Sequence, residues 1–158
     1  MAAAPARAAE INTRAAAYQQ RLIALDQDTR SRIAALPESR RRVITSHDAF
    51  GYFAAAYGVR FIAPRGWTTG SEPSAEAVAR IVRQARETKA SALLVENISD
   101  PRLIERIARE AGLKVGGALY SDALSAPGTA ADTYVHLFAH NVRTLVEAMT
   151  PARTEHAH

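Results

Sequence analysis

The sequence contains no cysteine among its 158 residues. Disulfide bonds, thiolate metal sites and cysteine nucleophiles are therefore excluded, whereas the redox compartment stays open. Lysine is almost as scarce, because Lys89 and Lys114 are the only two and arginine supplies nearly all of the positive charge. The formal net charge is +4 at pH 7. Because an arginine- and alanine-rich composition often reflects the genome, this charge favours nucleic-acid binding only weakly.

Long apolar runs are also missing. No stretch approaches the ~20 apolar residues of a membrane span, and the opening MAAAPARAAEINTR lacks the apolar core of a secretory signal. By itself, this start shows no signal peptide and predicts a chain that stays in the cytoplasm. Hydrophobic residues make up 47% and charged residues 23%, which indicates a globular protein, and the length favours a single domain.

The motifs of common catalytic and nucleotide-binding sites are absent from the sequence. No serine lies in a G-x-S-x-G elbow, and there is no G-x-G-x-x-G or Walker loop. The glycine pair Gly116 and Gly117 lies inside a predicted strand, where it indicates close packing rather than phosphate binding.

The spacing of apolar residues predicts helices that alternate with short strands. From about Glu10 to Leu36, apolar residues recur at three- and four-residue steps, which predicts one long helix with a narrow apolar stripe. The stripe consists of Ile11, Ala15, Tyr18, Leu22, Leu25, Thr29 and Ile33. We expect four strands, at residues 43–47, 59–63, 91–96 and 114–119, with shorter helices after them. Ser74 and Asp132 are expected to cap two of these helices. The alternation predicts an α/β fold, a four-stranded parallel sheet flanked by helices and preceded by the long helix.

Polar residues follow the predicted strands at their carboxyl ends, which share one edge of a parallel sheet. His47 ends the first strand, Glu96 the third, and Asp122 follows the fourth. Ligands bind at this edge in open α/β sheets. An imidazole with a carboxylate suits Zn²⁺ or Mn²⁺, so His47 and Asp122 are candidate metal ligands, and Glu96 is a candidate for orienting His47. The alternative is that His47 is a satisfied turn residue and Asp122 an ordinary loop acid.

A second histidine pair lies in the segment HLFAH. His136 and His140 are four residues apart, so a helix places both on one face. A zincin motif requires a glutamate directly after the first histidine, and this segment has a leucine there. The pair is therefore more typical of a helix surface or cap than of a metal site.

Four segments resemble a known family. SHDAFGYFAAAYGV, SEPSAEAVARIV, LLVENISDPRLIERIARE and GGALYSDALSAPGTAADTYVHLFAHNVRTL closely resemble the carboxyl-terminal lobe of the zinc/manganese solute-binding proteins of ABC transporters. They occur in the family's order and spacing, over about residues 42–149. The resemblance implies that residues 1–42 are the lower part of the interlobe backbone helix and a turn. Residues 43–150 would then form the carboxyl-terminal lobe, and residues 151–158 a disordered tail.

The resemblance also implies a ligand set. In this family one metal ion lies between two lobes, held by four side chains, and two of these positions match His47 and Asp122. A histidine at position 47 resembles the zinc-type variant. The other ligands belong to the amino-terminal lobe, which this sequence lacks. We therefore expect a truncated protein with an incomplete half-site and weak metal binding.

Function, partners and location follow from the same resemblance as expectations. The protein would bind zinc, or alternatively manganese, and deliver it to an ABC transporter permease. Its partners would be that permease and the missing amino-terminal lobe, with no nucleic acid and with membrane contact only through the permease. It would work in the periplasm and would not be an enzyme.

Two other classes of function remain open on the residues alone. One is a small α/β enzyme that uses His47 as a base oriented by Asp122. The other is a basic nucleic-acid-binding module that uses Arg40, Arg41 and Arg42. The simplest interpretation of this arginine run is a solvated turn.

Overall fold

The computed structural model describes residues 7–46, 48–63, 74–96 and 101–151. The elements in chain order are α1 (Ala8–Ala34), the 3-10 helix η2 (Glu38–Arg40), β1 (Arg42–Ile44), α2 (Gly51–Tyr57), β2 (Arg60–Ile62), α3 (Ala75–Glu87), β3 (Ala92–Glu96), α4 (Pro101–Ala111), β4 (Val115–Leu119) and α5 (Tyr134–Met149). The strands pair in parallel in the order β2-β1-β3-β4. The predicted α/β fold, a four-stranded parallel sheet with a long leading helix, is confirmed.

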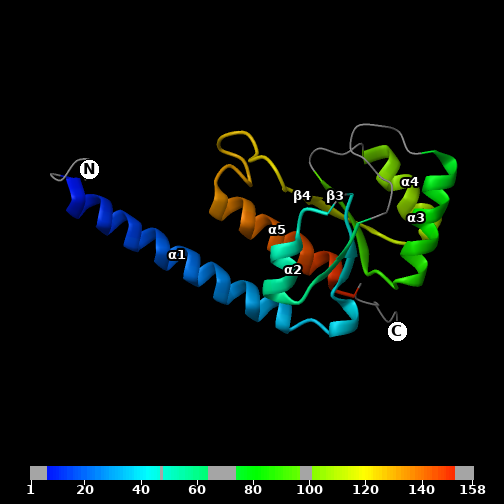
Figure 1. Ribbon diagram of the computed structural model, residues 1–158, viewed down its shortest axis with the longest axis horizontal. Helices are drawn as coiled ribbons and strands as arrows, with labels where there is room; N and C mark the ends of the chain where they lie inside the picture. Colours follow the sequence, from blue (N-terminus) through cyan, green and yellow to red (C-terminus); the bar gives the residue numbers. More distant parts are fainter. Residues whose placement is uncertain (1–6, 47, 64–73, 97–100, 152–158) are drawn as a thin grey trace, which may run out of the picture.

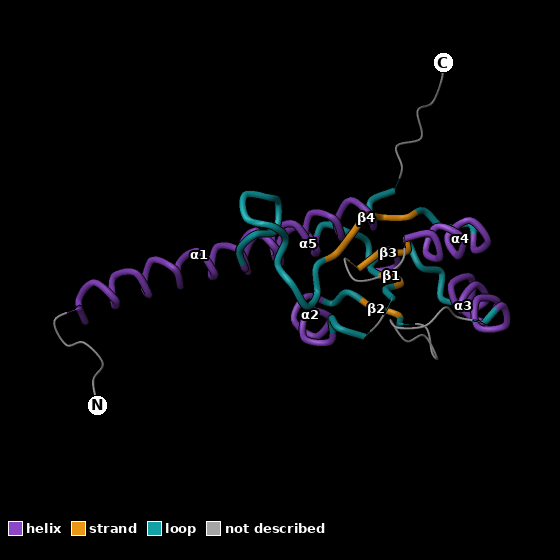
Figure 2. The backbone as a smooth tube through the Cα atoms, turned by 90° about the horizontal axis from the view of Figure 1, so that it is seen from above, coloured by secondary structure: helices purple, strands orange, loops and turns teal. Residues whose placement is uncertain are grey.

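The sheet lies between two layers of helices (Figures 1 and 2). Successive residues of a strand point to opposite faces, so Val43 of β1 packs with α1 and α5, whereas Ile44 packs with α3 and α4. Both residues are at most 1% exposed. In β3, Leu94 and Leu93 divide between the two cores in the same way. The two interior strands, β1 and β3, are thus buried on both faces, as parallel strands usually are.

β1 is shorter than predicted. It ends at Ile44, so the predicted strand at residues 43–47 is wrong at its carboxyl end. The pairing with β2 stops at Ile62, the last residue of that strand, and beyond it the Thr45 amide still donates to the Ile62 carbonyl. Thr45 and Ser46 are buried loop residues that follow the strand. His47 lies outside the described residues.

α1 is buried at one end only. Its predicted apolar stripe packs on the body through Thr29 and Ile33, which are 0% and 1% exposed. Farther toward the amino terminus, Ile11 and Tyr18 of the same stripe are 50% and 44% exposed, and every residue from Arg7 to Arg21 is exposed. Figure 1 shows this part of α1 extending beyond the rest of the molecule. The stripe is therefore longer than the surface that covers it.

One of the two predicted helix caps is wrong. The Ser74 hydroxyl accepts a hydrogen bond from the Ala77 amide at 3.2 Å, as predicted. α5, however, is capped by Thr133, whose hydroxyl accepts from the His136 amide. Asp132 instead accepts from the Gly128 amide at 2.9 Å, because its carboxylate turns back onto the preceding loop.

Arg40 and Arg41, the two arginines before β1, do not form a solvated turn. Arg41 donates to the carbonyls of Ala34 and Leu36, and Arg40 donates to the carbonyl of Met149. Carbonyls at the end of a helix have no partner within it and carry partial negative charge, so guanidinium groups bind there favourably. Arg40 and Arg41 are half-buried and close the ends of α1 and α5.

None of the described helices is long and apolar enough to cross a membrane.

α5 lies directly on β4 because of the glycine pair. A Cβ atom on Gly116 would lie 2.5 Å from the Ala148 Cβ and 3.0 Å from Leu94 Cδ2. Gly117 has φ +118° and a Cβ there would lie 2.9 Å from Thr144 Cγ2. The prediction that this pair serves close packing is confirmed.

Candidate metal site

The carboxyl ends of β1 and β3 meet at a buried polar contact. The register aligns Ile44 with Leu93, and beyond it the Ser46 hydroxyl donates to Glu96 Oε1 at 2.6 Å. Ser46 is 1% exposed and Glu96 is fully buried. A carboxylate in such surroundings needs hydrogen-bond donors. The structure therefore places Glu96 beneath the edge, beside Ser46, and not on its surface.

Asp122 lies at the same edge of the sheet, beyond β4. Leu119, the last residue of β4, is aligned with Glu96 of β3, and Asp122 follows three residues later. Its side chain is exposed, and the Ser121 hydroxyl donates to its Oδ2 atom at 3.2 Å. An exposed carboxylate at a strand end can bind a cation without the cost of burying a charge.

The remaining donors of a metal site are not assembled within the described residues. Among residues 7–46, 48–63, 74–96 and 101–151, no three His, Asp or Glu side chains form a group that could hold a metal ion. The assignment of His47 as a ligand stays a prediction because this residue lies outside those ranges. Carboxylates alone suit hard cations, so the preference for zinc depends on the imidazole at position 47.

His136 and His140, both on the first half of α5, have different hydrogen-bonding partners outside that helix. His136 Nδ1 and Asp132 Oδ1 are 2.7 Å apart, and this hydrogen bond, with that from the Gly128 amide, lowers the pKa of the Asp132 carboxyl. The His140 Nε2 atom is 3.0 Å from the Ala118 carbonyl oxygen, so it donates to it in the matching tautomer. The two imidazoles thus stabilise the loop and the strand, which agrees with a helix-surface role.

Asn141 also fixes the site edge, and we did not predict this from the sequence. Its side chain binds both backbone groups of Tyr120, two residues before Asp122. Asn141 is in helical register with the apolar residues Leu145 and Ala148. A polar residue on such a face is a local signal of a buried hydrogen-bonding partner, but it does not identify that partner.

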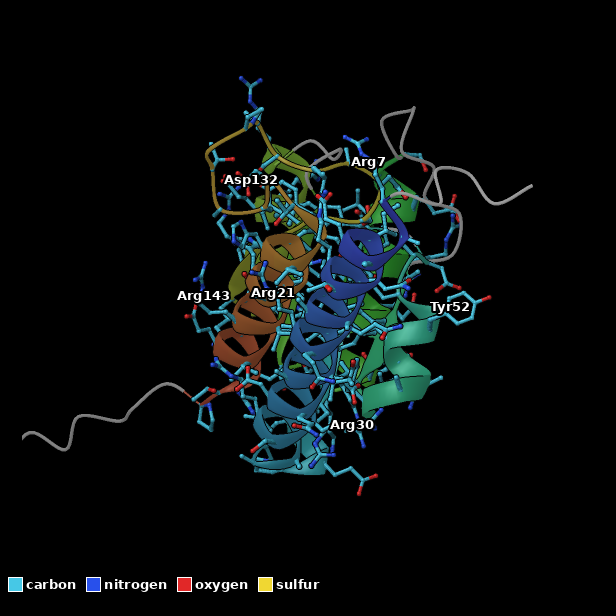
Figure 3. All side chains as sticks on the ribbon, turned by 90° about the vertical axis from the view of Figure 1, so that its left-hand side faces the viewer. Arg7, Arg21, Arg30, Tyr52, Asp132 and Arg143 are labelled. Carbon is cyan, nitrogen blue, oxygen red and sulfur yellow. The ribbon has the colours of Figure 1, made fainter. Side chains whose placement is uncertain are left out.

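A hydrogen-bonded cluster of Asp26, Arg30 and Tyr57 connects α1 to α2. The Tyr57 hydroxyl of α2 donates to Asp26 Oδ1 at 2.8 Å, and Arg30 Nε donates to Asp26 Oδ2 at 2.9 Å. Burial, with the Asp26 hydrogen bond, raises the pKa of Tyr57 to about 12. The hydrogen bond from Arg30 lowers the pKa of Asp26. Figure 3 shows Arg30 on α1, between α2 and α5.

Comparisons with known proteins agree with this geometry. The family described as ZnuA, zinc-uptake complex component A, periplasmic, matches residues 1–148. The zinc-binding protein TroA of Treponema pallidum is 36% identical over 150 residues, which are 92% of this chain and 49% of TroA. The solved structure of TroA superimposes with a TM-score of 0.82 at 34% identity, covering 94% of this chain and 55% of that one.

Other relatives are named for other metals. The manganese-binding lipoprotein MntA of Bacillus subtilis is 34% identical over 152 residues, 93% of this chain and 50% of MntA. The iron ABC transporter substrate-binding lipoprotein MtsA of Streptococcus pyogenes serotype M1 is 26% identical over 133 residues, 84% of this chain and 43% of MtsA. The chain spans about half the length of these curated relatives.

The fold is that of the matched half of TroA, a metal-binding protein with this α/β lobe. The chain belongs to the ZnuA family, whose named members are metal-binding transport proteins. The predicted family is therefore confirmed, as is the prediction that the chain belongs to a class of binding proteins rather than enzymes.

Proposed function

We propose that this chain is the carboxyl-terminal lobe of a metal receptor that serves an ABC transporter, and that His47 and Asp122 are its metal ligands. The observation that carries the proposal is the exposed carboxylate of Asp122 at the carboxyl edge of a sheet whose fold matches TroA. In this arrangement residues 43–150 form the lobe. Residues 1–42 form the lower part of the interlobe helix and its turn, and residues 151–158 a tail.

Zinc is the proposed cargo, with manganese as the alternative. The imidazole of His47 favours zinc over the harder manganese ion. Relatives named for zinc, manganese and iron support a divalent transition metal but leave its identity to the ligand set. Two side chains are fewer than the four donors of a tetrahedral site. The chain by itself therefore binds zinc weakly, with micromolar or lower affinity.

Glu96 supports the site without binding the metal. Its carboxylate is fully buried and accepts from Ser46, the residue next to His47. A buried carboxylate linked to the ligand loop can hold that loop in a single conformation. This position explains why Glu96 acts from beneath the site rather than as a ligand.

An amino-terminal lobe supplies the other ligands in this proposal. Apolar residues of the exposed stripe on α1, Ile11 and Tyr18, would be covered by it. Metal is captured in the cleft between the lobes, the receptor docks on the permease, and the ion is released as the lobes separate. The location is the periplasm, in keeping with the description of the family, and the membrane is contacted only through the permease.

Calorimetric zinc titration tests the ligand assignment. We expect weak binding by the wild-type chain, a large loss in His47→Ala and in Asp122→Ala, and none in the double variant. Asp48→Ala is the matched control, because Asp48 is an exposed acid beside His47 and its replacement removes the same charge as Asp122→Ala. Undiminished binding by the double variant would contradict the ligand assignment, and nanomolar binding by the wild-type monomer would contradict the half-site.

A further inference from the structure

The side chain of Asn141 binds the backbone of Tyr120 in the manner of a neighbouring strand. The Tyr120 amide donates to Asn141 Oδ1 at 2.9 Å, and Asn141 Nδ2 donates to the Tyr120 carbonyl at 2.7 Å. Asn141 is 7% exposed. One primary amide thus satisfies the donor and the acceptor of the same residue, which requires the backbone at Tyr120 to keep a fixed orientation.

This contact falls where the sheet no longer holds the chain. β4 is an edge strand of the described sheet and ends at Leu119, the last residue aligned with β3. Tyr120 is the next residue, and Asp122 follows two positions later. Without a partner at Tyr120, the chain would leave the sheet at Leu119 with its direction set by the loop alone. Asn141 therefore extends the ordered edge toward Asp122.

Other contacts between α5 and β4 hold the same segment. His140 Nε2 lies 3.0 Å from the Ala118 carbonyl oxygen. The His140 and Tyr120 rings pack edge to face, with 5.2 Å between their centroids. The close approach at Gly116 and Gly117 brings α5 near enough for these polar contacts. α5 thus binds the backbone on both sides of Leu119, from Ala118 to Tyr120.

We propose that Asn141 is a positioning residue for metal binding: by fixing the Tyr120 backbone it sets the place of the Asp122 carboxylate. This inference rests on the proposed role of Asp122 as a ligand. Asn141 does not itself touch the metal, because its amide is occupied by Tyr120. Residues that orient a ligand in this way typically change metal affinity by about ten- to a hundredfold when replaced.

A double-mutant cycle between Asn141 and Asp122 tests the inference. Asn141→Leu has a similar size and no charge, and it removes both hydrogen bonds to Tyr120. Asn141→Ala is the second variant in case leucine disturbs the packing. Val142→Ala is the matched control, because Val142 is the adjacent residue of α5 and 2% exposed. Its truncation weakens the core but removes no hydrogen bond, since a valine side chain has no polar atom. Zinc affinity, the absorption spectrum of bound Co²⁺ and the urea midpoint are measured on the full chain.

We expect Asn141→Leu or Asn141→Ala to weaken zinc binding about tenfold or more and to change the Co²⁺ spectrum. Val142→Ala should lower the urea midpoint and leave both readouts unchanged. In the Asp122→Ala background the Asn141 substitutions should have no further effect, because Asn141 acts through Asp122.

Two results would overturn the inference in different ways. In the first, Asp122→Ala weakens zinc binding, but the Asn141 substitutions either have no effect or have the same effect with and without Asp122. The positioning role of Asn141 is then wrong, and the assignment of Asp122 as a ligand stands. If Asp122→Ala binds zinc as the wild type does, the proposed ligand is wrong and the positioning role falls with it.

Discussion

The Ser46 hydroxyl donates a 2.6 Å hydrogen bond to Oε1 of Glu96, and both residues are buried. The two residues are fifty positions apart: Ser46 follows β1, and Glu96 is the last residue of the adjacent parallel strand β3. This contact joins the chain segment after β1 to the carboxyl end of the interior strand β3, so its loss should affect both that segment and the stability of the lobe.

Ser46→Ala should lower the free energy of unfolding by about 1–3 kcal/mol, because a buried carboxylate loses a hydrogen-bond donor. Urea denaturation measures the change. Thr13→Ala is the control: its hydroxyl bonds to the Ala9 carbonyl on the exposed part of α1, and we expect a change within about 0.5 kcal/mol. Equal small effects in the two variants would show that the Ser46–Glu96 contact does not stabilise the lobe.

Gly116→Ala should also destabilise the protein. The added Cβ would overlap Ala148 and press on Leu94, and relieving such overpacking in a core costs about 1–3 kcal/mol. Gly51→Ala is a matched control, because a Cβ at Gly51 meets nothing within 4 Å. It should leave stability unchanged or raise it slightly, since alanine favours helix over glycine. A Gly116→Ala variant as stable as Gly51→Ala would contradict the close packing of α5 on β4.

The Tyr57 hydroxyl should titrate at unusually high pH. Burial raises its pKa from 10.0 to about 12. Since the folded value lies above the unfolded one, the contribution of this phenol to stability is complete below pH 10 and is lost as the pH rises toward 12. Alkaline spectrophotometric titration should show a phenolate step near pH 12 that is absent in Tyr57→Phe.

Tyr52→Phe provides the control for this titration. Tyr52 lies on the same helix, α2, but is 97% exposed, and Figure 3 shows its side chain pointing away from the molecule. Its replacement should leave the step near pH 12 in place. A step that persists in Tyr57→Phe would assign the high pKa to another tyrosine.

Arg41→Met should lower the free energy of unfolding and should not affect nucleic-acid binding. The guanidinium donates to the Ala34 and Leu36 carbonyls at the end of α1, and losing a cation at such a position costs about 1 kcal/mol. Arg14→Met, on the exposed part of α1, is the control and should be nearly neutral in urea denaturation, since its ion pair with Glu10 is exposed.

The same two arginine variants test the basic-module alternative directly. A nucleic-acid-binding module would bind DNA or RNA with an affinity that falls steeply with salt. We expect no such binding that depends on Arg41, because its guanidinium is already bound to backbone carbonyls. Salt-sensitive binding that Arg41→Met abolishes without loss of stability would favour the alternative.

Local patterns were enough to predict most of the fold. The three- and four-residue spacing predicted α1, and the short apolar runs predicted all four strands to within three residues at each end. These predictions succeeded because a helix or a buried strand leaves its period in its own sequence. The strand at 43–47 was too long because strand ends depend on the partner, and β2 stops at Ile62.

The candidate site was predictable only in part. The residue types at the strand ends indicated a metal edge, and the resemblance to the family assigned His47 and Asp122, which remain predictions. Sequence spacing did not show that Asp132 binds back to Gly128 rather than capping α5, nor that Arg41 closes α1. Both are decided by which backbone groups are left unpaired nearby.

The sequence by itself determined the alternation of strands and helices, the family and the residue types at the carboxyl edge. Each of these depends on residues that are close together in the sequence. Only the tertiary structure decided that Glu96 is buried against Ser46 and that Asn141 holds Tyr120. These pairs are fifty and twenty-one residues apart. Their contacts exist because strand register and the packing of α5 on β4 bring distant polar groups together, where each must find a hydrogen-bond partner away from water.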